Sequence, residues 1–160
     1  MRVARRRAEL EVAPGERLLA WTTTVDGTVI GGTRDAIYLP DRLSWERVEA
    51  AGWDSDTSTF RLREVGTWGA PQQEHTFVID EPGRLLQLVR ERVTASVVLQ
   101  RHVPVNGRRG VRVIARRAPG RREEPSWAYE FDEGIDPADP EVRRLAAEAM
   151  VAAREELGAG

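Results

Sequence analysis

The sequence predicts an α+β protein built mainly from short β-strands, with two helices. Three observations lead to this fold class: β-branched or alternating apolar stretches bounded by turn residues, two amphipathic stretches of helical period, and their order, β-rich, helix, β-rich, helix. We expect an N-terminal tail over residues 1–15, a β-rich domain with its helix over 16–95, and a βββα unit over 96–160 that packs on the first domain.

Seven strands are predicted before the first helix. β-Branched and aromatic residues are frequent in each, and Gly, Pro, Asp or Ser residues separate them. The expected strands are 18–25, 28–30, 36–39, 43–45, 48–53, 59–65 and 75–79. Asp26-Gly27 predicts a type I′ hairpin turn, and Gly31-Gly32 predicts a bulge or a sharp bend. Residues 66–73 contain Gly, Pro and Gln and are expected to form a loop.

The first helix is predicted over about residues 81–93. Asp80 is the expected N-cap, and Pro82 suits the first turn. Leucines and valines at 85, 86, 88, 89 and 93 form a broad apolar stripe. We therefore expect this helix to pack against the strands that precede it.

Three further strands and a second helix follow. The strands are predicted over 97–105, 111–115 and 127–131. Asn106-Gly107 predicts a hairpin between the first two. Asp139 is the expected N-cap of a helix that begins at Pro140 and ends at Gly158. The small alanines on one side of this helix predict close packing on the sheet.

The composition excludes several classes of protein. Cys is absent, which excludes disulfides, thiol catalysis and Cys-ligated metals. All 24 basic residues are Arg, so a Schiff-base lysine and a P-loop lysine are excluded as well. No stretch approaches the ~20 apolar residues of a membrane span. The basic N-terminus lacks the apolar segment of a secretory signal, and we expect a cytoplasmic protein with no integral membrane association.

The charges are strongly segregated in the second half of the chain. Residues 97–122 hold eight Arg and no acid, whereas residues 123–160 hold three Arg and eleven acids. The eight are Arg101, Arg108, Arg109, Arg112, Arg116, Arg117, Arg121 and Arg122. Either they contact phosphates or an acidic partner, or the acidic strand and helix that follow neutralise them. We favour neutralisation, and nucleic acid is the less favoured partner because the net charge of the whole chain is −2.

Residues suited to catalysis are few. His75 and His102 lack the spacing of a metal site, and either serves as a general base only beside a carboxylate. The acids between 132 and 141 lack the spacing of a calcium loop, and helix capping already accounts for Asp139. We expect no catalytic residue, no metal and no cofactor, with an enzyme based on His75 or His102 kept as an alternative.

The five tryptophans are the remaining candidates for a core or a contact site. Trp21 and Trp127 lie on predicted strands and are expected to fill the core. Trp45 and Trp53 share a mixed face if that segment is extended. Trp68 lies in a Gly- and Pro-containing loop, where its indole either contacts a partner or folds over the core.

The first half of the chain resembles bacterial pleckstrin-homology-like or GRAM-like domains. The resemblance covers about residues 16–94 and rests on Gly32-Thr-Arg-Asp-Ala-Ile-Tyr-Leu39, Arg42-Leu-Ser-Trp-Glu-Arg-Val-Glu49 and Thr59-Phe-Arg-Leu62, followed by a strand and an amphipathic helix. It implies an antiparallel β-sandwich or half-open barrel closed by the helix. Members that bind phosphoinositides carry basic residues around the first hairpin, whereas residues 22–28 here contain Asp26 and no Arg. Binding of lipid headgroups therefore does not carry over.

These observations favour a non-enzymatic binding module for a protein or a small ligand. Its candidate contacts are a strand edge, Trp68 and the arginines, namely Arg101, Arg108, Arg109, Arg116, Arg117, Arg121 and Arg122. Binding of an anion or nucleic acid through the Arg-rich hairpin over 101–122 is the alternative, and the oligomeric state is left open.

Overall fold

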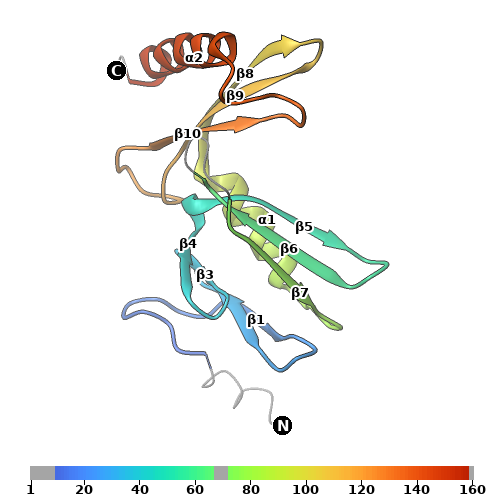
Figure 1. Ribbon diagram of the computed structural model, residues 1–160. Coiled ribbons are helices and arrows are strands. Elements are labelled where there is room, and N and C mark those ends of the chain that lie inside the picture. Colours follow the sequence, from blue (N-terminus) through green and yellow to red (C-terminus); the bar gives the residue numbers. More distant parts are fainter. Residues whose placement is uncertain (1–9, 67–71, 159–160) are drawn as a thin grey trace. The chain divides into compact units, whose positions relative to one another are not determined.

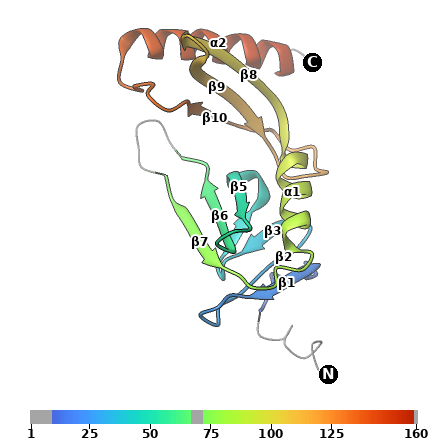
Figure 2. The ribbon, with the colours of Figure 1, turned by 90° about the vertical axis from the view of Figure 1, so that its right-hand side faces the viewer.

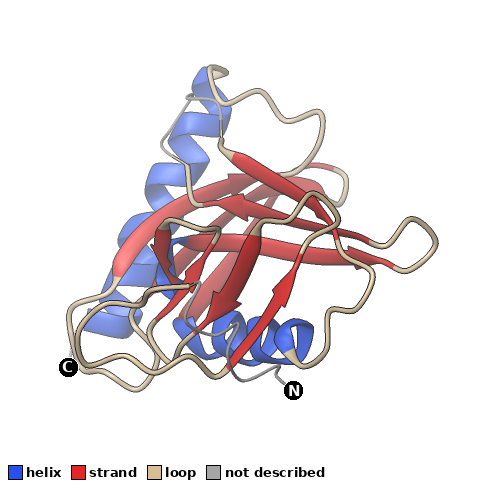
Figure 3. Cartoon of the chain, turned by 90° about the horizontal axis from the view of Figure 1, so that it is seen from below, coloured by secondary structure: helices blue, strands red, loops and turns tan. Residues whose placement is uncertain are grey.

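The computed structural model describes residues 10–66 and 72–158, and over these residues it confirms an α+β fold. The described strands form three separate antiparallel sheets, not one closed barrel, and two α-helices accompany them. Figure 3 distinguishes the strands from the helices by colour. The chain forms two compact units. Unit 1 comprises the described residues of Met1–Val65, Gln73–Ser96 and Ala118–Arg121, and unit 2 those of Gly66–Gln72, Val97–Arg117 and Arg122–Gly160.

Unit 1 contains two antiparallel meanders followed by a helix (Figure 1). The first sheet has the order β1-β2-β3-β4, with β1 (Ala20–Thr23), β2 (Val29–Gly32), β3 (Ala36–Tyr38) and β4 (Arg42–Ser44). A short 3₁₀ helix, η2 (Trp45–Arg47), leads into the second sheet. Its order is β5-β6-β7, with β5 (Val48–Asp54), β6 (Thr59–Glu64) and β7 (Glu74–Val78). The helix α1 (Leu85–Ser96) contacts β1 and β2 of one sheet and β5 of the other.

The core of unit 1 is apolar and receives side chains from both sheets and from α1. Its buried members are Ile30, Ile37, Leu39, Trp45, Val48, Phe60, Leu62, Ile79, Leu85 and Val89. Trp45 is fully buried, and its Nε1 donates a hydrogen bond of 2.9 Å to the carbonyl oxygen of Thr33. A Cβ on Gly32 would lie 2.7 Å from Leu88 Cδ2 and 3.1 Å from Trp45 Cζ2, so the glycine makes room for both side chains.

The glycine turns of the first sheet differ from the sequence predictions. Gly27 has φ +93°, but Asp26 does not have a positive φ, so this is not a type I′ turn. The loop instead closes through the Thr24 N–H to Thr28 carbonyl bond, and Asp26 accepts from Thr28. Gly31-Gly32 forms no bulge, because both residues pair in register with β1 and β3. Close packing, not chain bending, requires glycine there.

The helix α1 starts and ends later than the predicted 81–93. Gly83 takes φ +58°, which interrupts a right-handed helix, and the side chain of Thr22 donates to the Glu81 carbonyl oxygen at 2.7 Å. Asp80 is therefore not the N-cap. The helix continues to Ser96, whose hydroxyl donates to the Val93 carbonyl oxygen, and β8 begins at the next residue.

The buried carboxylate of Glu16 fixes the N-terminal segment to the first sheet. The hydroxyls of Thr33 and Tyr38 each donate to Oε1 at 2.8 Å, and Arg42 Nη2 lies 2.7 Å from Oε2. Burial raises the pKa of Glu16, but these hydrogen bonds and the charge of Arg42 outweigh it, so the net pKa lies below the ordinary 4.5. Glu16 thus contributes stability when it is ionised.

Replacing Glu16 with Gln should destabilise unit 1 by about 2 kcal/mol at pH 7, because bonds to a charged acceptor are lost. The stabilisation by Glu16 is present above the pKa of the unfolded chain and is lost as pH falls through the lower folded value. Urea unfolding at pH 7 and pH 3 should therefore show a smaller loss of stability on acidification in Glu16→Gln than in the wild type. Glu74 is exposed, so Glu74→Gln serves as the matched control. If Glu16→Gln and Glu74→Gln lost equal stability on acidification, the role of Glu16 would be contradicted.

Unit 2 is a three-stranded antiparallel sheet with a helix on one face, as the sequence predicts (Figure 2). The sheet has the order β10-β9-β8, with β8 (Val97–Asn106), β9 (Arg109–Arg116) and β10 (Ser126–Phe131). The helix α2 (Pro140–Gly158) contacts β8 and β9. The predicted N-cap is confirmed, because Asp139 Oδ1 accepts from the Glu141 N–H at 2.8 Å.

The tryptophan predictions are partly wrong. Trp21 and Trp127 are only half-buried, whereas Trp45 lies at the centre of the core of unit 1. Trp45 does not share an extended face with Trp53, since it starts the 3₁₀ helix η2. Trp127 instead lies under α2, where the guanidinium of Arg154 is 5.2 Å from the ring centroid.

Candidate functional site

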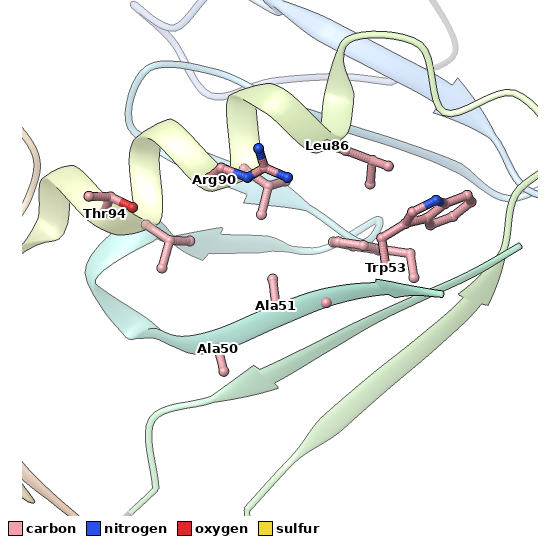
Figure 4. A pocket seen from close by; sticks show the side chains of 10 residues that line it. Ala50, Ala51, Trp53, Leu86, Arg90 and Thr94 are labelled. Atoms are coloured by element: carbon pink, nitrogen blue, oxygen red, sulfur yellow. The ribbon is translucent and has the colours of Figure 1, made fainter. Parts of the chain in front are cut away.

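An apolar groove of 330 Å³ lies between β5 and α1 in unit 1 (Figure 4). Its walls are small or apolar except at one position. The strand side consists of Ala50, Ala51, Gly52, Trp53 and Phe60, and the helix side of Leu86, Val89, Arg90, Val93 and Thr94. Ala51 and Gly52 are exposed, so the groove is open to solvent along the strand.

The strand side of the groove is also an edge of a sheet. In the described part of the chain, β5 pairs with β6 and with no other strand. Two hydrogen bonds mark the ends of the β6–β7 pair: the Ile79 N–H donates to the Ser58 carbonyl oxygen, and the Glu64 N–H donates to the Gln73 carbonyl oxygen. The backbone N–H and C=O groups of the even-numbered residues of β6 therefore point towards β7. The backbone groups of the odd-numbered residues of β6 then point towards β5.

The register places Ala50, Gly52 and Asp54 opposite those odd-numbered residues. By the alternation of an antiparallel ladder, the backbone N–H and C=O of Ala51 and Trp53 therefore point away from β6. No described residue pairs with these groups. The side chains of Ala51 and Trp53 rise towards α1, which lies across the groove (Figure 4).

The helix side of the groove carries a single charge. Leu86, Arg90 and Thr94 follow one another at helical spacing along the wall that faces β5 (Figure 4). Leu86 is half-buried next to Trp53, while Arg90 is exposed. Arg90 has no ion pair among the described residues, in contrast to Arg42 and Arg63, which pair with Glu16 and Glu49.

The groove is lined mainly by apolar side chains. Its ten lining residues include no histidine and no carboxylate, and therefore no base that could activate a nucleophile. Its features are an apolar surface, unpaired backbone groups and one guanidinium, which together suit an extended chain with an apolar side chain.

Several of the eight arginines of residues 97–122 pair with carboxylates of the same unit. In unit 2, Arg101 pairs with Glu156, and Glu130 receives both Arg112 at 3.6 Å and Arg116 at 2.8 Å. Arg116 is only 3% exposed, so it is an interior residue and not a surface contact. In unit 1, Arg121 lies 3.4 Å from Asp35. For Arg101, Arg112 and Arg116 the structure agrees with neutralisation by the acidic strand and helix, whereas Asp35, the partner of Arg121, lies outside residues 123–160.

The other arginines of residues 97–122 have no ion pair among the described residues. Arg109 donates to the Glu133 carbonyl oxygen at 3.2 Å, and Arg108 and Arg122 are exposed. Arg117 lines a polar hollow of 530 Å³ in unit 2 together with Glu124, Trp127 and Arg154. The hollow also contains the C-terminal end of α2, whose carbonyls disfavour an anion. Binding of an anion by these residues stays a prediction.

Each histidine contacts a carboxylate in its own unit. His75 Nε2 lies 2.7 Å from Glu64, and His102 Nε2 lies 2.9 Å from Asp132. The hydrogen bonds from His102 and from the Gly110 N–H hold the pKa of Asp132 below its ordinary value. Neither histidine lines the groove or the hollow, so neither faces a site for a substrate there.

Trp68 lies outside the described residues. Over the described residues, no group of three or more His, Asp or Glu side chains is placed to hold a metal ion. Neither described α-helix has the length and apolar character that a membrane crossing requires. The groove itself was not predicted from the sequence, because Ala50, Ala51 and Gly52 carry no functional group and Arg90 lies among many exposed arginines.

The chain matches no family model, no curated protein and no solved structure. The geometry of the groove is therefore the basis for a functional proposal.

Proposed function

We propose that this protein is a non-enzymatic binding module that takes an extended segment of another protein as an added strand on β5. An apolar side chain of the segment occupies the groove between β5 and α1. The observation that carries this proposal is the combination, on one strand, of an apolar groove and an edge that is unpaired over residues 10–66 and 72–158. Main-chain hydrogen bonds supply affinity in this mode, and the groove supplies specificity.

The local sequence of β5 supports strand addition. Two outward-facing residues, Ala51 and Trp53, offer backbone donors and acceptors in a row, and the small Ala51 leaves space above the strand. Trp53 and Leu86 lie next to each other and form an apolar end of the groove (Figure 4). A segment bound there removes this apolar surface from water. Burial of apolar surface contributes a favourable free energy of about 25 cal/mol per Å².

The order of elements in unit 1 supports a pleckstrin-homology-like scaffold as part of this proposal. A four-stranded meander, a three-stranded meander and a helix that touches both sheets follow one another. The first hairpin, between β1 and β2, holds Asp26 and no Arg, which favours a protein ligand over a lipid headgroup. A cytoplasmic location is part of the same proposal.

Replacing Ala51 with Pro should weaken binding strongly and leave the fold intact. The N–H that proline lacks points away from β6, so no bond of the sheet is lost, and edge strands tolerate proline. Peptides of twelve residues selected from a random phage-displayed library on the full chain serve as probes. We expect Ala51→Pro to weaken the best peptide by about tenfold or more in fluorescence polarisation, because a main-chain bond and the approach to the edge are lost.

Arg61→Ala in the neighbouring strand β6 is the control. Arg61 is exposed and does not line the groove, so binding should be retained. Amide chemical shifts of the wild type should change on peptide addition in β5 and α1. Failure to select any peptide, equal binding by Ala51→Pro, or shift changes confined to unit 2 would contradict the proposed function.

A further inference from the structure

Arg90 gives the groove a defined charge. It is the one charged residue among those that line the groove in the described part of the chain. Its side chain stands over the groove between Leu86 and Thr94 (Figure 4). Because it is exposed and makes no described ion pair, its five N–H donors are free for a ligand.

The spacing along the helix matches the spacing along an added strand. From Leu86 to Arg90 the helix rises about 6 Å, at ~1.5 Å per residue. Two residues of a β-strand span about 6.6 Å, and side chains two residues apart point to the same side. If the apolar side chain of the segment lies against Trp53 and Leu86, the side chain two residues along therefore lies opposite Arg90.

We propose that the segment bound on β5 carries Asp or Glu two residues from its apolar anchor, so that its carboxylate meets Arg90. This inference rests on the proposed function and names the class of its partner: an acidic, apolar segment of another protein. A single guanidinium suits one carboxylate, which it can hold by two parallel hydrogen bonds, whereas phosphorylated ligands are held by clusters of Arg.

The experiment is a selection from the random twelve-residue library on three immobilised proteins: the wild type, Arg90→Glu and Arg61→Glu. Arg61 is an exposed residue of β6. Its neighbours Phe60 and Leu62 point into the core, so the Arg61 side chain faces away from the core. Arg61 also has no ion pair among the described residues. Both variants change the net charge equally. Neither position is buried, so both variants should fold.

The wild type and Arg61→Glu should enrich peptides with Asp or Glu two positions from an apolar residue. Arg90→Glu should instead enrich Lys or Arg at that position. The best acidic peptide of the wild type should bind Arg90→Glu about tenfold more weakly, and Arg61→Glu within about twofold, since exposed charges at a distance are screened.

The outcomes separate this inference from the proposed function. Peptides that depend on Ala51 but show no charge preference, or that keep their acidic preference in Arg90→Glu, would overturn the role of Arg90 and leave strand addition standing. If no selected peptide binds the wild type more tightly than Ala51→Pro, both the role of Arg90 and the proposed strand addition are overturned. Enrichment of acidic residues at other spacings would overturn the proposed alignment with Leu86.

Discussion

Replacing Trp45 with Ala should lower the free energy of unfolding of unit 1 by about 4 kcal/mol, the largest effect of a single substitution that we expect. Trp45 is fully buried among the apolar side chains of both sheets and α1. Its removal leaves a cavity that the surrounding strands cannot close, and it leaves the Thr33 carbonyl oxygen without its 2.9 Å partner. Urea unfolding followed by far-UV circular dichroism measures the change.

Two further variants separate the causes of this loss. Trp45→Phe keeps much of the apolar volume and removes the N–H, so it should cost about 2 kcal/mol. Trp21→Ala removes the same side chain from a half-buried site in β1 and should cost less than half as much as Trp45→Ala. Equal destabilisation by Trp21→Ala and Trp45→Ala would contradict the assignment of Trp45 as the centre of the core.

Replacing Gly110 with Ala should destabilise unit 2 by about 3 kcal/mol. Gly110 is a buried residue of β9, opposite Pro104 in β8, next to an irregularity in the pairing. A Cβ on Gly110 would lie 1.9 Å from the carbonyl oxygen of Val103 and 2.8 Å from the Cα of Pro104. Both are backbone atoms, so relief of the clash requires the two strands to separate.

Hydrogen–deuterium exchange measured by mass spectrometry can assign the effect of Gly110→Ala to unit 2. Peptides from β8 and β9 should exchange faster in this variant, while peptides from β2 and β3 keep their protection. Gly52→Ala is the control, because a Cβ on that strand glycine meets no atom within 4 Å and should change stability by less than about 0.5 kcal/mol. Unchanged protection of β8 and β9 would contradict the predicted clash.

Local patterns in the sequence predict most of the fold. The alternation in 59–65 predicts β6, and Asp139-Pro140 marks the start of α2 correctly, because both depend on neighbours in the chain. The start of α1 is missed, since Asp80 and Pro82 suit a helix start but Gly83 takes a positive φ and Thr22 holds the Glu81 carbonyl. That last contact comes from a strand 59 residues away, which no local pattern contains.

The candidate site is less accessible to sequence reasoning than the fold. A groove arises only when β5 and α1 meet, and its strand side is made of residues without functional groups. The segregated charges drew attention to Arg101, Arg112 and Arg116, which the structure pairs with acids of unit 2. Arg90, which the structure leaves unpaired among described residues, has no distinguishing neighbour in the sequence.

The edge of β5, which no described residue pairs with, also exposes the protein to aggregation with its own copies, because any exposed strand edge is a template for another strand. Two features of β5 shorten this template. The pairing with β6 is irregular between Val48 and Ala50, and the strand ends at the charged Asp54, whose carboxylate accepts from the Asp56 N–H at 2.9 Å. The regularly paired part of β5 is thereby limited to a few residues, which shortens the template that its edge offers to another strand.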